Sequence, residues 1–215
     1  MTIDINSNLE NTPVVPLVQA DDPETAIQIS RALASGGLTV AEIVFRTDAA
    51  LECLAAVATE VPEMIAGAGT VLNTTQAQQA IDAGAKFIVC PGLDVETVRL
   101  CQSISIPIFP GTMTPSEVMQ AWNLGLREVK FFPASLAGGL SMLKALGSVF
   151  RGVRFMPTGG VSVTNLAEFL ALPCVLACGG SWLTPPSAIA AGNYDEVTRL
   201  AAEAVAIARQ IKAGS

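Results

Sequence analysis

The chain has 215 residues, of which 51% are hydrophobic and 14% are charged, and its formal net charge is −7. This composition excludes a disordered chain, and the lack of a basic stretch argues against nucleic-acid binding. The chain contains no histidine, which excludes Ser-His-Asp and Cys-His catalysis and histidine-ligated metal sites. The polar N-terminus lacks the pattern of a secretory signal, and no apolar run approaches the ~18–20 residues of a membrane span. We therefore expect a cytoplasmic protein that does not bind a membrane.

The cysteines are odd in number and form no CxxC pair, which argues against a zinc or redox motif. Their apolar surroundings favour small buried side chains in a reducing compartment. They are Cys53, Cys90, Cys101, Cys174 and Cys178.

After a short polar segment (residues 1–12), eight apolar runs alternate with amphipathic helical stretches. The runs are VVPLVQ, TVAEIVFR, MIAGAGT, KFIVCPG, IPIFPGT, EVKFFPA, RFMPTGG and VLACGGS. Landmarks within successive runs lie 20 to 26 residues apart, which is enough for a strand, a loop and a crossover helix. Each run therefore predicts a strand followed by a helix.

Helix start signals support this alternation. Asp22-Pro23-Glu24 opens a stretch that ends at Gly36-Gly37, and Asn73-Thr74-Thr75-Gln76 opens one that ends at Gly84. Thr114-Pro115-Ser116-Glu117 places proline at the first helical position and an acid in the first turn. Residues 193–212 predict a long amphipathic helix at the end of the chain.

Eight such units without a linker indicate an α/β protein with one domain over residues 1–215, a single (β/α)8 TIM barrel. The alternative, a doubly wound open sheet, would carry a glycine-rich fingerprint after its first strand, and VVPLVQADDPE has none. In a barrel, reactive side chains are expected at the carboxyl ends of the strands.

Lys130 is the candidate nucleophile, because of four lysines it alone lies within an apolar strand, Glu-Val-Lys-Phe-Phe-Pro. Burial disfavours an ammonium group and favours the neutral amine, which attacks a ketone to form a Schiff base. The alternative is a lysine at a strand edge whose ammonium group reaches solvent.

The second run places Glu42, Val44 and Arg46 on one face, because strand side chains alternate, and Ile43 and Phe45 on the other. A carboxylate and a guanidinium would then point into the barrel. A purely structural salt bridge is the alternative, but burying two charges is a poor source of stability. A carboxylate can instead transfer protons, and a guanidinium can bind a substrate carboxylate.

By the same alternation, Ala68 and Thr70 should face inward, where small side chains leave room for a ligand. Turn signals follow the fourth and fifth runs at Pro91-Gly92 and Pro110-Gly111. Phe132 shares the face of Lys130, where it either lines the pocket or belongs to the core.

Glycines end the last two runs, as Thr158-Gly159-Gly160 and Gly179-Gly180-Ser181. Glycine lets backbone N–H groups approach an anion, and the loops after strands 7 and 8 are the usual phosphate site of this barrel class. The negative net charge means that capture of an anion would be local.

The stretches PVVPLV, EIVFRT, GAGTVLN, CPGL, PGTMTPSE, VKFFPA, RFMPTGGV and GGSWL together resemble the class I 2-keto-3-deoxy-6-phosphogluconate (KDPG) aldolase family, which also acts on 4-hydroxy-2-oxoglutarate (KHG). They run in the family's order from Pro13 to Leu183. The resemblance implies cleavage of KDPG to pyruvate and glyceraldehyde 3-phosphate, with cleavage of KHG to pyruvate and glyoxylate as a second candidate reaction. It also implies a homotrimer, small-molecule substrates, and neither a metal nor another cofactor.

The resemblance also implies a role for each site residue. Lys130 would form the Schiff base and Glu42 would be the general acid and base. The others would bind substrate: Arg46 and Thr70 at the pyruvate carboxylate, Pro91 and Phe132 as walls, and Thr158, Gly159, Gly160, Gly180 and Ser181 at the phosphate.

Three positions depart from the family pattern. Phe45 replaces a smaller aliphatic residue on the outward face, and Cys90 stands where serine is common. The N-terminal segment is short compared with members whose N-terminal helix plugs the barrel. Arg46-Thr47 favours the gluconate branch over the related 2-keto-3-deoxy-phosphogalactonate aldolases.

Other readings remain open. A metal-dependent aldolase would need clustered acids or histidines near the strand ends. A non-catalytic phosphosugar-binding barrel, or an isomerase, would use Lys130 only as a phosphate contact. A barrel without a site would leave Lys130, Glu42 and Arg46 buried without purpose.

Overall fold

The computed structural model describes residues 5–213. The helices are α1 (Ile5–Asn11), α2 (Pro23–Ser35), α3 (Ala50–Glu60), α4 (Thr74–Asp82), α5 (Val95–Ser103), α6 (Pro115–Asn123), α7 (Gly139–Val149), α8 (Leu166–Leu170), α9 (Pro186–Ala190) and α10 (Tyr194–Ala213). The strands are β1 (Val14–Val18), β2 (Val40–Val44), β3 (Ile65–Gly69), β4 (Ile88–Val89), β5 (Ile108–Phe109), β6 (Gly111–Thr112), β7 (Glu128–Phe131), β8 (Arg154–Pro157) and β9 (Cys178–Gly180).

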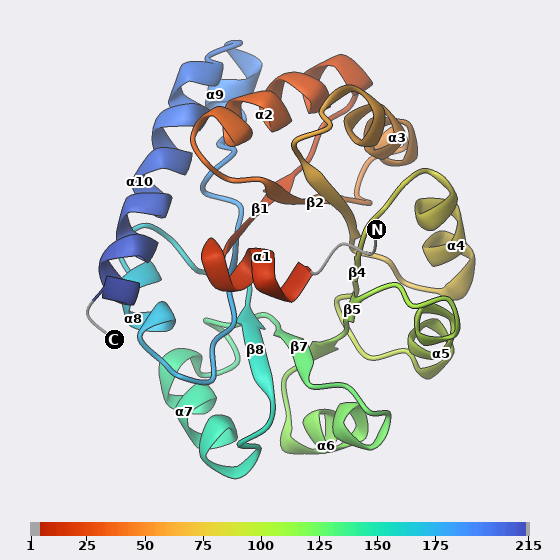
Figure 1. The fold of residues 1–215 in the computed structure, drawn as a ribbon, viewed down its shortest axis with the longest axis vertical. Coiled ribbons are helices and arrows are strands. Elements are labelled where there is room, and N and C mark those ends of the chain that lie inside the picture. The colour runs from red at the N-terminus through yellow and green to blue at the C-terminus, as the bar shows by residue number, and fades with distance from the viewer. Residues whose placement is uncertain (1–4, 214–215) are drawn as a thin grey trace.

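The strands form two parallel sheets with helices outside them. One sheet has the order β5-β4-β3-β2-β1-β9, and the other has the order β6-β7-β8. Figure 1 shows the strands around the centre of the molecule, with helices α2 to α10 on the periphery. Alternating strands and helices with parallel pairing make this an α/β fold, and all eight apolar runs contribute to the sheets.

The continuous eight-stranded ladder expected from the sequence is interrupted at two places. The fifth run is divided into β5 and β6 at Pro110, which has no N–H to donate, although its carbonyl accepts from Lys130 N at 2.9 Å. Between β8 and β9 only isolated bridges occur, Phe155 to Val175 and Thr158 to Gly179. The two bridges are three residues apart in one segment (155 to 158) and four residues apart in the other (175 to 179). This mismatch is that of a β-bulge, so the ladder cannot continue between the bridges.

The predicted helix starts are confirmed. The Asp22 side chain accepts the N–H of Thr25 at 2.9 Å at the start of α2, and Asn73 caps α4 in the same way. Thr114 and Glu117 form a capping box at α6. These caps satisfy N–H groups that have no partner within the helix, so each helix begins where the sequence indicates.

Strand side chains alternate between two apolar clusters. The larger lies between strands and helices and includes Ile43, Ala68 and Val129. The smaller is formed by inward-facing strand residues such as Val40, together with Ile5 and Leu9 of α1; the full buried set is Ile5, Leu9, Val15, Val40, Phe87, Val89, Phe109, Met156, Leu176 and Ala177. The space between the strands is therefore filled with apolar side chains at the end where α1 lies.

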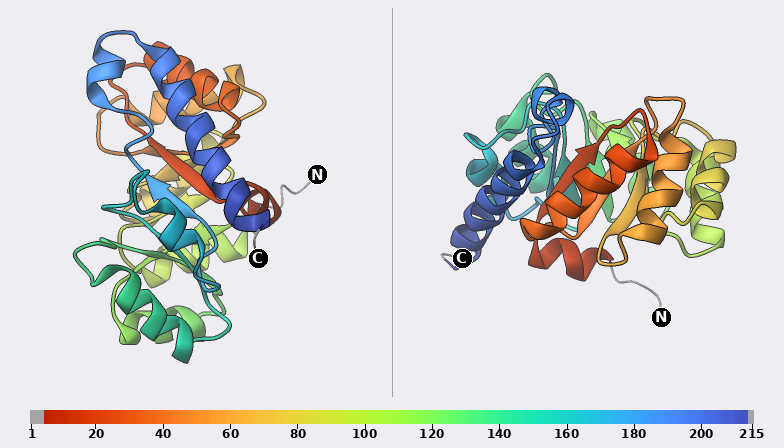
Figure 2. Two further views of the ribbon diagram at one scale, coloured as in Figure 1. Left: turned by 90° about the vertical axis from the view of Figure 1, so that its left-hand side faces the viewer. Right: turned by 90° about the horizontal axis from the view of Figure 1, so that it is seen from above.

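Helix α1 covers one end of the strands. It crosses the centre of the strand ring in Figure 1 and lies at one end of the molecule in Figure 2. Arg154 of β8 bonds to Glu10 of α1 and, at 2.8 Å, to Glu128 of β7. The N-terminal segment, expected to be short, thus still contains a helix that plugs this end, because Ile5 and Leu9 are buried in the inner cluster.

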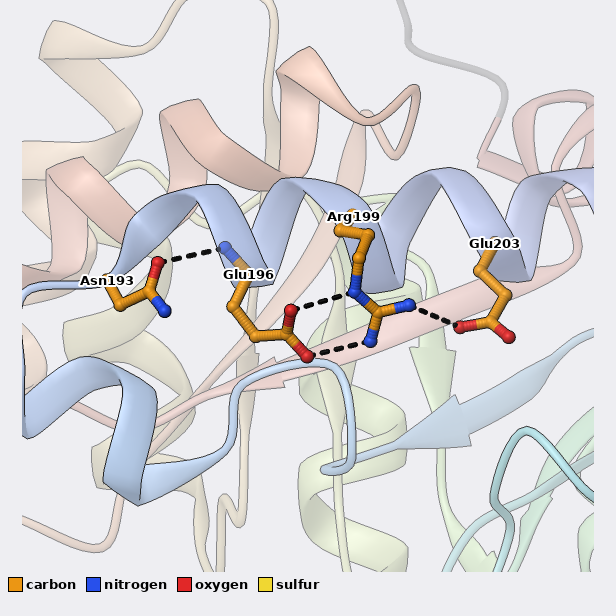
Figure 3. Close-up of polar contacts among 4 residues, drawn as sticks. All are labelled: Asn193, Glu196, Arg199 and Glu203. Atoms are coloured by element: carbon orange, nitrogen blue, oxygen red, sulfur yellow. Dashed lines mark hydrogen bonds and ion pairs between the residues drawn. The ribbon is translucent and has the colours of Figure 1, made fainter.

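The last helix, α10, packs beside α2, where the Thr198 hydroxyl donates to the carbonyl of Ala32 at 3.0 Å. Its exposed face carries a ladder of polar contacts (Figure 3). Arg199 bonds to Glu196 at 2.7 Å and to Glu203 at 3.1 Å. Exposed pairs of this kind add about 0.3–0.5 kcal/mol each, so apolar packing holds the helix in place.

Candidate functional site

Lys130 and Glu42 meet inside the ring of strands. Lys130 lies on β7 and Glu42 on β2, and the two side chains are only 3% and 0% exposed. Lys130 Nζ donates to Glu42 Oε1 at 3.3 Å. The second carboxylate oxygen, Oε2, is buried and has no hydrogen-bond partner among the residues that the structure describes. One carboxylate oxygen thus contacts the amine, and the other has no partner among the described residues.

The alternation predicted for the second run is confirmed for Glu42, Ile43 and Phe45 but not for Arg46, which lies beyond the end of β2 and is exposed. Ile43 belongs to the outer cluster, and Phe45 packs against that cluster. Val40 belongs to the inner cluster, on the same side as Glu42. Parallel pairing of β2 with β1 and β3 holds Glu42 in this orientation, because a one-residue slip would turn every side chain over.

Two further side chains contact Lys130, one near its amine and one at its backbone carbonyl. The Phe132 ring, just beyond β7, has its centroid 5.4 Å from Lys130 Nζ, within reach of a cation–π contact. The buried Thr112 hydroxyl donates to the carbonyl of Lys130 at 3.1 Å and so fastens β6 to β7. Thr112 was not among the candidates from the sequence, although it lies in the run IPIFPGT.

The prediction for the third run was wrong at Ala68, which belongs to the outer cluster. The inward positions are Gly67 and Gly69, since a Cβ atom there would meet Phe87 and Glu42. Thr70, just past the strand, has φ +61°, a left-handed conformation that β-branched residues rarely adopt. Ala68 and Thr70 were assigned to one face by alternation, but the regular strand ends at Gly69, before Thr70.

Arg46 lies beyond the end of β2, with an exposed side chain, and is not inside the core. It lines a cleft of about 610 Å³ together with Ser181 and Val44. Lys130 and Glu42 do not line this cleft. The whole lining is Leu17, Gln19, Ala20, Asp21, Asp22, Thr25, Val44, Arg46, Ser181, Thr184, Pro186, Ile189 and Ala190.

Asp21 and Asp22 place two carboxylates in the same cleft as Arg46. The N–H of Thr25 and then its hydroxyl lower the pKa of Asp22 by donating hydrogen bonds to it. Asp22 is thereby committed to capping α2. Arg46 is the basic residue of the cleft, so an anion entering it would bind there.

Pro91 follows β4 and is half-buried, beside the fifth run: the N–H of Gly111 donates to the carbonyl of Gly92 at 3.2 Å. Its neighbour Cys90 packs in the outer cluster, and burial raises the pKa of the Cys90 thiol to about 12. Cys90 therefore contributes to the core between strands and helices.

The two glycine loops lie side by side, because Thr158 bridges to Gly179. Thr158 is buried, and Gly159 and Gly160 have φ +94° and +80°, which glycine adopts readily. The Ser135 hydroxyl lies against Gly160, where an added Cβ would be 1.8 Å from it. Ser135 was missed because no pattern in the sequence associates the loop after β7 with the loop after β8.

The remaining two predicted residues, Gly180 and Ser181, lie at the end of β9 and directly after it. Gly180 is buried within the strand, and Ser181 is exposed directly after it. Ser181 shares the cleft with Arg46, so the structure brings the ends of β2 and β9 together. The structure thus forms two groups of predicted residues, the buried pair Lys130 and Glu42 and the rim at the carboxyl ends of the strands.

Within residues 5–213, no cluster of three or more histidine, cysteine, aspartate or glutamate side chains is arranged to hold a metal ion. Over the same range, none of the helices has the length and apolar character needed to cross a bilayer.

Comparison with known proteins places these features in a family. The family model described as "KDPG and KHG aldolase" matches residues 5–200. The chain belongs to this family. It is 46% identical to the KHG/KDPG aldolase of Escherichia coli K12, with 93% of each chain covered. It is 45% identical to the 2-dehydro-3-deoxy-phosphogluconate aldolase of Treponema pallidum, with 95% of this chain and 98% of the relative covered.

Solved structures of aldolases from the same family share the fold. The KDPG aldolase of Legionella pneumophila superimposes with a TM-score of 0.91 at 36% identity, covering 95% of this chain and 100% of the other. That structure holds pyruvate, captured at low pH as a covalent carbinolamine intermediate. The KDPG aldolase of Zymomonas mobilis ZM4, with 3-phosphoglycerate, has a TM-score of 0.88 at 40% identity and covers 96% and 97% of the two chains.

Proposed function

We propose that this aldolase cleaves KDPG to pyruvate and glyceraldehyde 3-phosphate through a Schiff base on Lys130. The observation that carries the proposal is the contact between Lys130 Nζ and Glu42 Oε1, at 3.3 Å, inside the ring of strands. The contact supports a site in which an amine and a proton acceptor would reach one substrate molecule. The carbinolamine captured in the Legionella relative supports covalent chemistry of this class.

The first stage joins enzyme and substrate. The neutral amine of Lys130 attacks C2 of the keto acid to form a carbinolamine; its hydroxyl group takes up a proton from water and leaves as water, which gives an iminium ion. The iminium is the electron sink for the next bond to break. This covalent sink does the work that a metal ion does in a metal-dependent aldolase, so we propose a metal-independent class I lyase without another cofactor.

The second stage breaks the carbon–carbon bond. Glu42 takes the proton of the C4 hydroxyl while the C3–C4 bond breaks, the aldehyde leaves, and the electron pair passes to the iminium to form an enamine. Glu42 then returns the proton to C3, and water hydrolyses the new iminium to pyruvate and free Lys130. The unpartnered Oε2 of Glu42 supports this assignment, because it can accept a proton without first losing a hydrogen bond.

The substrate would lie between the buried pair and the rim. Arg46 and Thr70 would hold the carboxylate of the keto acid, and Pro91 and Phe132 would flank the imine. The phosphate would be bound by Thr158, Gly159, Gly160, Gly180 and Ser181. The adjacency of the two glycine loops, the positive φ of Gly159 and Gly160 and the exposed side chain of Ser181 support the phosphate assignment.

KHG is a second candidate substrate. It shares the C1–C4 arrangement of KDPG on which the proposed chemistry depends, and it carries a carboxylate in place of the phosphate-bearing end. The Escherichia coli relative named KHG/KDPG aldolase supports this extension.

We also propose that the two sheets form one closed (β/α)8 barrel and that the protein is a homotrimer. The hydrogen bond from Lys130 N to Pro110 and the bridges between β8 and β9 connect the sheet edges, which supports closure. Leu72, Met113 and Leu136 are 59%, 41% and 88% exposed in loops after strands, which supports an apolar contact between copies. Light scattering behind a sizing column tests the trimer.

The test of the function is reductive trapping. Incubation with pyruvate and borohydride should inactivate the enzyme irreversibly and add a pyruvate-derived mass to the peptide that contains Lys130. Pyruvate release from KDPG, measured in parallel, should stop as the adduct forms. Activity that is lost with EDTA and gives no adduct would indicate a metal-dependent lyase, and binding of phosphosugar without turnover would indicate a binding protein.

A further inference from the structure

The geometry points to Gly69 as a positioning residue: the absence of a side chain there creates the slot that holds the Glu42 carboxylate beside Lys130. A Cβ atom at Gly69 would lie 2.0 Å from Oε1, 2.3 Å from Cγ and 2.4 Å from Cδ of Glu42. The whole end of the Glu42 side chain therefore rests on the backbone of Gly69. This inference rests on the proposed role of Glu42.

The strand register shows why this slot is needed. Glu42 is paired with Gly67 on the neighbouring strand, and Gly69 is paired with Val44. The carboxylate does not stay over its own partner but reaches forward, over Gly69, toward the carboxyl end of the strands. Diagonal contacts of this kind are within reach of long side chains. The space over Gly67 is filled instead by the Phe87 ring, 2.4 Å from where its Cβ would lie.

Backbone conformation does not account for glycine at this position. Gly69 ends strand β3, it is absent from the positive-φ glycines of residues 5–213, and its carbonyl accepts the N–H of Phe45 at 2.7 Å. Alanine could adopt the same backbone. Alanine is excluded at position 69 because its methyl group would collide with the Glu42 carboxylate.

A methyl group at position 69 would displace the carboxylate rather than the strand. Ordinary van der Waals contact begins near 3.4 Å, so Oε1 would have to move by about 1.4 Å from its 2.0 Å approach. Glu42 is fully buried, so it cannot swing into solvent, and its distance to Lys130 must change. A misplacement of about 1 Å can cost roughly 100-fold in rate.

The test is a double-mutant cycle with kinetics on KDPG. Gly69→Ala should lower kcat roughly 10- to 100-fold and change KM by less than about threefold, because the proton transfer is impaired and binding is not. In the Glu42→Ala background, adding Gly69→Ala should change kcat by less than about twofold, since no carboxylate remains to be displaced. Equal losses in both backgrounds would overturn the inference.

Gly67→Ala is the matched control, because it adds the same methyl group to the same inward face but meets Phe87. It should lower the free energy of unfolding while kcat of the folded enzyme stays within about threefold. An equal fall in kcat in this variant would mean that any methyl on this face of β3 is harmful, which would also overturn the inference.

Two measurements keep the result interpretable. Should Gly69→Ala fail to fold, Gly69→Ala/Glu42→Ala must fold, because the contact is gone; a double variant that also fails counts against the slot. Pyruvate and borohydride with the unmodified enzyme test the proposed function separately. A labelled Lys130, together with an unchanged kcat in Gly69→Ala, would leave the function intact and reject the role of Gly69.

Discussion

Lys130 and Glu42 lie 88 positions apart in the chain, yet the amine of one donates to the carboxylate of the other at 3.3 Å. Both side chains are almost completely buried. A buried pair gives little net stability, because the cost of removing both groups from water is comparable to their attraction. The arrangement is better explained by chemistry than by folding.

Replacing the amine should abolish turnover. Lys130→Met removes the nucleophile, so pyruvate release from KDPG should fall to background and borohydride trapping should add no mass. Lys144→Met, on the exposed face of α7, is the control and should retain both. Circular dichroism should show that the variant folds. Turnover retained by folded Lys130→Met would reject the lysine assignment.

Replacing the carboxylate should slow catalysis without preventing capture of pyruvate. Glu42→Gln keeps the size of the side chain but cannot accept a proton, so kcat should fall roughly 10²–10⁴-fold. Lys130 should still be labelled by pyruvate and borohydride. Glu128→Gln, on the same strand as Lys130 but bonded to Arg154, serves as the control for the loss of one carboxylate. A kcat within about threefold of the unmodified enzyme would exclude Glu42 as the general acid and base.

The phosphate loop can be tested by comparing two substrates. Ser181→Ala removes a hydroxyl that would donate to the phosphate, and hydrogen bonds to charged groups are worth about 1.5–3 kcal/mol. We therefore expect kcat/KM for KDPG to fall about 10- to 100-fold and kcat/KM for KHG to change by less than about threefold. Ser187→Ala, exposed on α9, is the control. Equal losses with both substrates would argue against a phosphate site at Ser181.

Helix α1, which covers one end of the strands, should contribute to the stability of the protein but not to its catalytic rate. Leu9 is 1% exposed, and Leu→Ala changes at buried positions cost about 2–5 kcal/mol. Urea unfolding of Leu9→Ala should show a loss of that size, with kcat on KDPG unchanged. Val149→Ala, at a position 73% exposed on α7, should cost less than about 0.5 kcal/mol. A fall in kcat for folded Leu9→Ala would show that α1 also shapes the site.

The thiols should resist alkylation in the native protein. Burial raises the pKa of Cys90 to about 12 and that of Cys101 to about 11, and it also raises the pKa of Cys178. A raised pKa means less of the reactive thiolate at pH 8, and the thiolate fraction grows only as the pH rises toward the pKa.

Iodoacetamide at pH 8, followed by mass spectrometry, should therefore leave Cys90 and Cys178 unmodified in the folded enzyme. All five cysteines should react in denaturant, which serves as the control. Alkylation of Cys90 in the native state at the rate of a free thiol would mean that its surroundings open readily.

The order of the strands and helices could be predicted from the sequence because the signals that determine it are local. Apolar runs at regular spacing and caps such as Asp22 and Thr114 act over a few residues, so they predict elements before the fold is known. Alternation along a single strand likewise placed Glu42 inward. The same rule failed at Ala68, which packs in the outer cluster, and the left-handed conformation of Thr70 does not continue the alternation of β3.

By itself, the sequence determined the eight strand–helix units, the inward face of β2 and the loops that carry the glycines, since each depends on neighbouring residues. Only the tertiary structure decided that Glu42 touches Lys130, that Gly69 leaves space for the carboxylate, and that Pro110 divides a strand. These facts depend on which strands become neighbours when the chain folds. Contacts between residues far apart in the chain arise only from that packing, and no local pattern records them.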